Sequence, residues 1–161
     1  MIISNSTPLI NFSSVGGLEL LHALFGEISV PEAVWDETVG QSHKYPSALA
    51  IQQCDWIHKI AITNYQLRDV FLLELDRGEA EAITLALEQH AELVLIDERS
   101  GREVAERVGL NFTGTIGCLS RAKKLGVISD IRSRLDKIMQ EAGFWVSPRF
   151  YEKILKDHGE A

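Results

Sequence analysis

The sequence predicts an α/β fold in which helices cover both faces of a parallel sheet, giving three layers. Short apolar strands alternate with helical segments along the chain, and this alternation is typical of parallel sheets. The chain has 161 residues, a length that suits one domain. We therefore expect a single domain over residues 1–161, with C-terminal helices at 130–157 packed on its core.

Runs of apolar residues identify the strands. The segments 1–4 and 27–30 are expected as the first two, and 93–96 is a fully apolar strand that ends at Asp97. A further strand is expected at 110–112, whereas 56–62 is ambiguous. Asp97 and Asn5 thus directly follow strands, and the carboxyl ends of parallel strands form the edge where open α/β sheets bind ligands.

Glycine, proline and capping residues predict where helices begin and end. Thr7-Pro8 reads as a helix N-cap followed by proline at the first helical position, with the helix ending near Phe12. Asp76-x-x-Glu79 matches a capping box at the start of an amphipathic helix over 79–90. Further helices are expected at 18–25, 32–39, 47–53, 66–75, 99–108, 116–125, 130–142 and 148–157, and a polar loop at 40–46.

Composition excludes several classes of protein. Hydrophobic residues make up 45% of the chain and charged residues 24%, as in an ordinary soluble protein. No stretch reaches the roughly 18 apolar residues of a membrane helix, and the N-terminus lacks a signal peptide, so we expect a cytoplasmic protein without a membrane partner. There is no P-loop, dinucleotide fingerprint or Gly-x-Ser-x-Gly elbow. The net charge of −7 argues against strong non-specific attraction to nucleic acid.

Three acidic residues and one amide are the candidate site residues. Asp97 follows a strand, Glu37 lies on the apolar side of the helix after the second strand, and Asn5 follows the first strand. Glu79 shares a helix face with buried apolar positions three to four residues apart, where a carboxylate costs free energy unless it is paired or bound to a cation. This pattern predicts an acidic pocket that binds a metal ion.

Each candidate also has a purely structural interpretation. Asp97 could cap the helix that starts at Glu98, and Glu79 could serve only its capping box. Glu37 could be an exposed residue at a helix boundary. Glu81, two positions after Glu79, faces roughly the opposite side of the helix, and we favour Glu79 over it as the third acid.

Substrate contacts are expected from hydroxyl and basic residues. Thr115 starts a helix after a strand, so its hydroxyl and nearby amides could hold a phosphate, although an N-cap role is the simpler interpretation. Arg99, Lys123 and Lys124 could steer a nucleic acid backbone. The two lysines belong to a basic strip between Arg121 and Lys137, for which a solvated helix face is the alternative.

Several segments together resemble the PIN domains, in the branch related to prokaryotic toxin ribonucleases. They are, in chain order, Ser4-Asn5-Ser6-Thr7-Pro8-Leu9-Ile10, Gly78-Glu79-Ala80-Glu81-Ala82-Ile83, Leu95-Ile96-Asp97-Glu98-Arg99, Thr113-Gly114-Thr115-Ile116-Gly117 and Ala142-Gly143-Phe144-Trp145-Val146-Ser147. The similarity runs over nearly the whole chain.

The resemblance implies a parallel-sheet nuclease whose carboxylates hold Mg²⁺ or Mn²⁺. The four family acids map to Asn5, Glu37, Glu79 and Asp97, with Thr115 as an accompanying hydroxyl and Thr7 near the first position. Asn5, Glu79 and Asp97 would be the metal ligands. RNA would be the substrate, and an antitoxin protein and a homodimer would be the partners. Asn5 departs from the family pattern because an amide stands where that pattern has an aspartate.

The sequence therefore leaves three functions open. The first is a metal-dependent ribonuclease, weakened by the missing charge at Asn5. The second is a catalytically degenerate module that binds RNA or a partner through the same groove. A third, in which Asp97 accepts a phosphoryl group, is disfavoured because no pair of acids follows the first strand.

Overall fold

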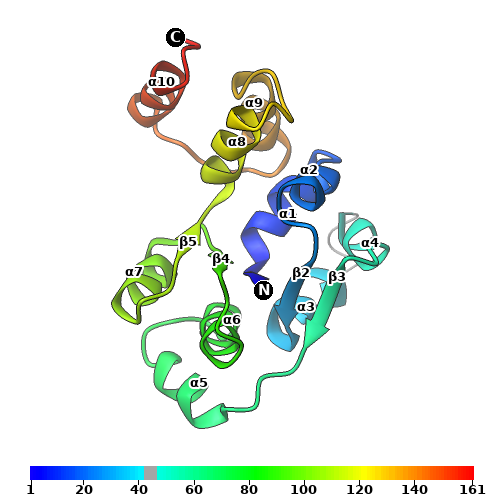
Figure 1. Ribbon diagram of the computed structural model, residues 1–161, viewed down its shortest axis with the longest axis vertical. Coiled ribbons are helices and arrows are strands. Elements are labelled where there is room, and N and C mark those ends of the chain that lie inside the picture. The colour runs from blue at the N-terminus through cyan, green and yellow to red at the C-terminus, as the bar shows by residue number, and fades with distance from the viewer. Residues whose placement is uncertain (42–46) are drawn as a thin grey trace.

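The computed structural model describes residues 1–41 and 47–161, so most of the loop expected at 40–46 lies outside the described residues. The described helices and strands alternate along the chain as the sequence predicts (Figure 1). Within this part of the chain, no helix is long and apolar enough to cross a membrane.

Five parallel strands form the central sheet, which confirms the predicted α/β fold class. The strands are β1 (Ile2–Ser4), β2 (Ile28–Pro31), β3 (Ile57–Ile60), β4 (Leu93–Leu95) and β5 (Phe112–Thr113). Their order in the sheet is β3-β2-β1-β4-β5, and every pair is parallel. The ambiguous segment at 56–62 therefore contains a strand, β3, which pairs with β2.

The strand order reverses between β1 and β4. The chain builds the sheet in one direction from β1 to β3 and then continues on the other side of β1 with β4 and β5. In such sheets the crevice beyond the carboxyl ends of the two strands at the reversal is the usual ligand site. Here these ends carry Asn5, directly after β1, and Ile96 to Glu98, directly after β4.

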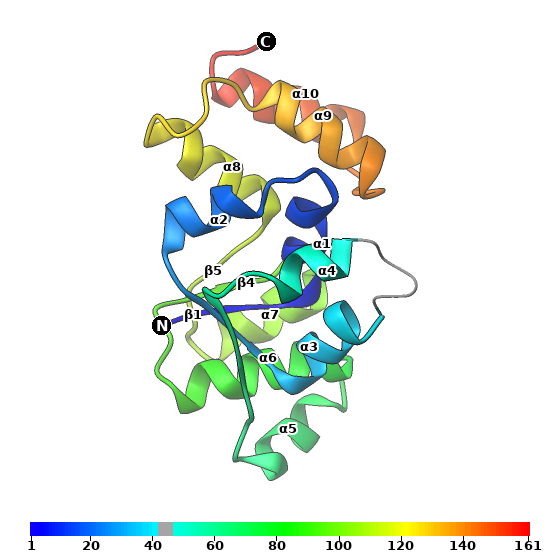
Figure 2. The same ribbon diagram turned by 90° about the vertical axis from the view of Figure 1, so that its right-hand side faces the viewer.

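The helices pack on both faces of the sheet. They are α1 (Ser6–Ser14), α2 (Leu18–Phe25), α3 (Glu32–Thr38), α4 (Ser47–Gln52), α5 (Tyr65–Phe71), α6 (Arg77–Glu88), α7 (Arg99–Arg107), α8 (Thr115–Lys124), α9 (Arg132–Glu141) and α10 (Pro148–Asp157), with a 3₁₀ turn, η1, at Val39–Gln41. Figure 2 shows α1, α2 and α8 above the sheet and α5 and α6 below it.

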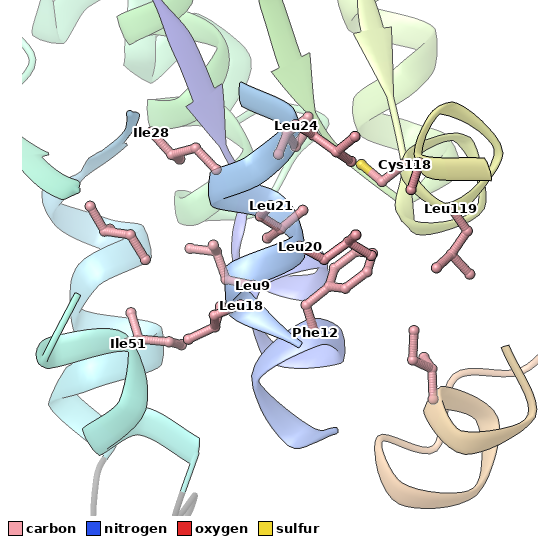
Figure 3. Packing of buried hydrophobic residues seen from close by; sticks show 14 of the residues in the cluster. Leu9, Phe12, Leu18, Leu20, Leu21, Leu24, Ile28, Ile51, Cys118 and Leu119 are labelled. Atoms are coloured by element: carbon pink, nitrogen blue, oxygen red, sulfur yellow. The ribbon is translucent and has the colours of Figure 1, made fainter. Parts of the chain in front are cut away.

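Alternating strand residues supply two separate apolar cores. Leu95 of β4 faces the core that α1, α2 and α8 cover, whereas Val94 and Ile96 face the core that α6 covers. In the first core, Leu9, Phe12 and Leu21 of α1 and α2 lie between Ile51 of α4 and Leu119 of α8 (Figure 3). The alternation follows from the two-residue period of side chains along a strand.

The two C-terminal helices extend the first core. Leu135 and Ile138 of α9 and Ile154 of α10 are buried and belong to the same cluster as Leu119 of α8. The side chain of Glu160 holds this end in place by accepting hydrogen bonds from the backbone N–H groups of Ile131 and Arg132, at 2.8 and 2.9 Å. These contacts satisfy N–H groups at the start of α9 that would otherwise lack partners.

The first helix starts two residues earlier than the sequence predicts. Asn5 is its N-cap and Ser6 its first helical residue, so Thr7 is not the cap and Pro8 is the third helical residue rather than the first. Proline is tolerated there because the first four N–H groups of a helix have no partner within the helix. Thr7 is thereby free to donate its hydroxyl hydrogen bond elsewhere.

Candidate nuclease site

Asn5 lies at the centre of the strand reversal. Its side chain is 3% exposed, and its backbone N–H donates to the carbonyl of Leu95 at 2.9 Å. The amide Nδ2 donates to Oε2 of Glu98 at 3.1 Å. Because a carboxylate can only accept, the nitrogen must face Glu98, and Oδ1 is left buried without a hydrogen-bond partner among the described residues. An orphaned buried oxygen of this kind calls for an explanation, and a cation is one that suits it.

Glu98 connects the first and fourth strand ends and was not among the residues selected from the sequence. Besides accepting from Asn5, it accepts a hydrogen bond from the hydroxyl of Thr7. Its charge also raises the pKa values of Glu37, Glu79 and Asp97. Its position next to Asp97 was the only available signal, because a helix cap alone does not need a second acid.

Glu37 reaches the site from the end of α3. Its carboxylate accepts a hydrogen bond from the hydroxyl of Ser6, at the start of α1. It also packs so closely on Gly78 that a Cβ atom added to this glycine would lie 2.5 Å from either carboxylate oxygen. Glycine in a helix costs about 1 kcal/mol relative to alanine. The absence of a side chain at residue 78 therefore makes room for the Glu37 carboxylate.

Gly78→Ala is expected to displace Glu37 without unfolding the protein. The far end of the glutamate side chain can move away from the new methyl group, and alanine favours α6 by about 1 kcal/mol, so the melting temperature should hold or rise. Metal-dependent activity should fall about tenfold if Glu37 serves the reaction. Gly40→Ala is the matched control, since its Cβ would make only an ordinary 3.7 Å contact with Asp36. Equal activity of both variants and the unmodified chain would argue that the position of Glu37 is irrelevant.

The capping box predicted at Asp76 and Glu79 is present. The backbone N–H of Glu79 donates to Asp76 at 2.8 Å, and the N–H of Asp76 donates to Oε2 of Glu79 at 3.2 Å. Oε1 of Glu79 accepts from the hydroxyl of Ser100 at 3.3 Å, which brings the carboxylate towards the start of α7. Glu79 is 3% exposed, so the cap and the acidic site share one buried side chain.

Glu81 has a different environment from Glu79, and the choice of Glu79 as the third acid stays a prediction. Its carboxylate accepts from Arg77 at 2.9 Å and from Arg68 at 3.4 Å, and from the backbone N–H of Ala33 at 3.3 Å. It is buried, but two guanidinium groups compensate its charge. Glu81 therefore ties α6 to α3 and α5.

Asp97 caps a helix, although not the one expected. The helix that starts after Glu98 receives no hydrogen bond from a capping side chain. Instead Oδ1 of Asp97 accepts from the backbone N–H of Thr115 at 2.8 Å, and Oδ2 accepts from the Thr115 hydroxyl at 2.7 Å. Asp97 is held against the start of α8 rather than α7, because β5 places that helix beside the end of β4.

Thr115 positions Asp97. Its side chain is fully buried, and its Oγ1 accepts a hydrogen bond from Nδ2 of Asn11 at 3.0 Å while donating to Asp97. Every polar group of the threonine side chain is thus occupied by the protein. These bonds give Thr115 an orienting role, and a direct contact of Thr115 with substrate stays a prediction.

Arg102 is a cation that sequence reasoning missed. Its Nε donates to the carbonyl of Ile96 at 2.9 Å, and its charge lowers the pKa of Asp97. A Cβ on Gly114 would lie within 2.5 Å of both Asp97 and Arg102, so these two side chains meet at that glycine. Only the packing of α7 against β5 brings Arg102 to this place, and no motif predicts it.

Burial raises the pKa values of Glu37, Glu79 and Asp97. Neighbouring carboxylates raise these pKa values further. Asp76 and Glu98 act on both glutamates, and Glu98 also acts on Asp97. Hydrogen bonds from Ser6, from the Asp76 backbone and from Thr115, respectively, oppose the shift. Of the groups that shift these three pKa values, Arg102 alone is a cation, and it acts only on Asp97. Without a bound metal ion, the three acids therefore have little positive charge around them.

This shortage predicts how stability depends on pH. Since the folded state holds protons that the unfolded state releases, the free energy of unfolding falls as pH rises through the raised pKa values. Melting curves in EDTA between pH 5 and pH 8 should show this fall. Glu79→Gln keeps an acceptor for the Asp76 N–H but removes one titrating group, so its fall should be smaller. An identical pH profile for both proteins would contradict the raised pKa of Glu79.

The donor set fits a hard divalent cation in its chemistry. Mg²⁺ and Mn²⁺ prefer carboxylate and carbonyl oxygens, and Asn5, Glu79 and Asp97 offer these atoms around one strand reversal. As the side chains stand, however, no group of three or more Asp, Glu, His or Cys residues in the described ranges could hold a metal ion. The carboxylates are engaged instead by Ser100, the capping box and Thr115.

The predicted substrate-binding residues differ in availability. The side chain of Arg99 is 93% exposed and pairs with Glu103 one helical turn on, and Lys124 is exposed at the end of α8. Lys123 donates to Glu160 at 2.7 Å and to the carbonyl of His158 at 2.6 Å. Lys123 therefore also stabilises the C-terminal end, and a substrate contact by either lysine stays a prediction.

Comparison with known families agrees with the fold. A family model described as a PIN domain matches residues 1–160 of the chain. The chain therefore belongs to the PIN domain family and has the fold of PIN-type nucleases, as the motifs suggested. A search of curated proteins finds no match.

Proposed function

We propose that this protein is a metal-dependent ribonuclease of PIN type, acting in the cytoplasm. The observation that carries the proposal is the buried Oδ1 of Asn5 at the strand reversal, which has no hydrogen-bond partner in the part of the chain that the structure describes and lies beside carboxyl groups with raised pKa values. Asn5, Glu79 and Asp97 would hold Mg²⁺ or Mn²⁺. A divalent cation, when bound, supplies Lewis acidity towards the scissile phosphate and lowers the pKa of the attacking water.

The other candidate residues would accept a proton, orient the acidic side chains or steer the substrate. Glu37 would accept a proton from water during attack on phosphorus, because burial raises the pKa of its carboxyl group and the Ser6 hydroxyl donates a hydrogen bond to it. Thr115 keeps Asp97 in one orientation through two hydrogen bonds, and Thr7 does the same for Glu98 through one. Exposed Arg99 would steer the phosphate backbone towards the site.

Cleavage of end-labelled single-stranded RNA with Mn²⁺ and with EDTA tests the proposal. We expect cleavage with Mn²⁺ alone, and products without a 2′,3′-cyclic phosphate, because water rather than the 2′-hydroxyl attacks. A DNA strand of the same sequence serves as the comparison substrate. Cleavage that continues in EDTA, or products with cyclic ends, would contradict a metal-dependent hydrolysis.

The toxin half of a toxin–antitoxin pair is the biological role that we propose for this activity, with an antitoxin as protein partner and a homodimer as the assembly. The support is the similarity of the chain to PIN-type toxin ribonucleases over the motifs quoted above. Arrest of growth when the gene is expressed, relieved by Asp97→Asn, would be the expected result.

Asn5 favours a second candidate, a module that binds RNA or a partner without cleaving. Asn5 carries no charge and its amide nitrogen donates to Glu98, so a metal would have one charged ligand fewer than with an aspartate at this position. This candidate predicts binding that survives EDTA together with no cleavage in any metal. Loss of all binding on chelation would exclude it.

A further inference from the structure

An aromatic cavity opens beside the acidic site. It has a volume of about 410 Å³, within the range of small-molecule sites of roughly 300–1,000 Å³. Asp97 and Arg102 contribute its polar lining, and β5 and the start of α8 form part of its wall. Its aromatic lining comes from Phe112, Phe144, Trp145 and Phe150.

Two of these aromatic side chains are exposed to an unusual degree. Trp145 lies between α9 and α10 with 78% of its surface exposed, and Phe150 of α10 is 48% exposed. Val146, which follows Trp145, is buried in the first core and anchors the segment between α9 and α10. Val146 therefore fixes the segment, while Trp145 and Phe150 present their rings at the cavity. Leaving these rings in water forgoes the free energy of burying them, and a bound ligand that covers them would recover it.

We infer that this cavity is a subsite for one unpaired nucleobase of the nucleic acid strand whose phosphate lies over Asp97. The inference rests on the proposed function, because the nucleobase would belong to the nucleotide next to the reacting phosphate. A purely apolar partner would not account for the polar lining. Base edges carry acceptors that match the guanidinium of Arg102.

The chemistry of the lining suits a base rather than a sugar or an apolar side chain. Exposed aromatic rings stack on the π-face of any base, so such a subsite selects single strands without a strict sequence. Arg102 lies over the ring of Phe112, 5.6 Å from its centroid, so its guanidinium group adjoins the aromatic lining and brings a positive charge to the cavity. A base in a duplex is already stacked and cannot enter, so the cavity discriminates against double strands.

The test is binding of a fluorescein-labelled ten-nucleotide RNA to the full chain in EDTA, where cleavage is absent. Trp145→Ala should weaken binding about tenfold, and Phe150→Ala by a similar factor, because one stacked base is lost in each case. Trp145→Phe should restore most of the affinity, since it keeps a ring. Tyr65→Ala is the matched control, because Tyr65 is 51% exposed on α5 and does not line the cavity.

An abasic nucleotide separates stacking from other effects. Scanning one abasic position along the RNA should weaken binding by the unmodified chain at one position and leave binding by the Trp145→Ala variant unchanged there. A DNA strand of the same sequence should respond to Trp145→Ala in the same way, since stacking does not need the 2′-hydroxyl. Duplex RNA should bind more weakly than the single strand.

Two results would overturn the subsite. The first is equal RNA affinity of the Trp145→Ala variant and the unmodified chain, even if the chain cleaves RNA with Mn²⁺, which would leave the proposed function intact. The second is a change from dimer to monomer in Trp145→Ala with unchanged RNA binding, which would assign the aromatic patch to contacts between copies of the chain. Conversely, Trp145-dependent binding by a protein that never cleaves would support the subsite and refute the nuclease.

Discussion

Asn5→Asp is expected to raise the affinity for Mn²⁺ at least tenfold and to destabilise the metal-free protein at neutral pH. The amide now donates to Glu98 at 3.1 Å, and an aspartate would set two carboxylates at that distance. A unit charge pair at 4 Å and an effective dielectric of 20 is worth about 4 kcal/mol, an upper bound because the pair can share a proton instead. A divalent cation would relieve this repulsion.

Calorimetry with Mn²⁺ and melting curves in EDTA measure the two effects. The melting temperature of Asn5→Asp should lie below that of the unmodified chain in EDTA and rise more steeply with Mn²⁺. Asn111→Asp is the matched control, because Asn111 is exposed just before β5, at the amino-terminal edge of the sheet. Equal Mn²⁺ affinity of Asn5→Asp and the unmodified chain would show that the orphaned oxygen of Asn5 does not face a cation site.

Asp97→Asn is expected to lower metal-dependent cleavage about 100-fold while the protein stays folded. The substitution removes a negative charge that the metal would need, and residues around metal ligands already change activity by about 10–100-fold when altered. One amide oxygen can still accept from the Thr115 N–H, so only the bond to the threonine hydroxyl is compromised, at a cost of about 1 kcal/mol.

Steady-state cleavage rates and melting curves distinguish catalysis from stability in this variant. Thr115→Val gives an intermediate case, with a loss of about tenfold, since Asp97 would keep its charge and lose one orienting hydrogen bond. Asp157→Asn, on an exposed pair with Lys153, is the control for removal of an aspartate charge. If Asp97→Asn keeps full activity and Mn²⁺ affinity, Asp97 serves only to cap α8.

The sequence predicts the framework of this molecule well because local patterns determine it. The apolar run before Asp97 and the alternation of short strands with helices are enough for a parallel sheet, and the Asp76 and Glu79 pair defines the start of α6. Glu79 can serve both as a capping residue and as a member of the acidic site. Its carboxylate closes the capping box and still lies buried beside Ser100.

What the sequence does not predict depends on contacts between distant segments. Glu98 is joined to Asn5 across 93 positions of sequence, and Asp97 to Thr115 across 18, and neither partner follows from spacing. Arg102 is brought to Asp97 by the packing of α7 alone. The same holds for Trp145, because a tryptophan in an apolar segment would ordinarily be assigned to a core, and only the structure shows it exposed.

The most direct test of the nuclease site is the rate at which end-labelled single-stranded RNA is cleaved by the Asn5→Asp variant and by the unmodified chain, with Mn²⁺ and with EDTA. We expect the variant to cleave at least tenfold faster than the unmodified chain with Mn²⁺, and neither protein to cleave with EDTA. Absence of cleavage by both proteins with Mn²⁺, or equal cleavage with and without EDTA, would contradict a metal-dependent nuclease at the strand reversal.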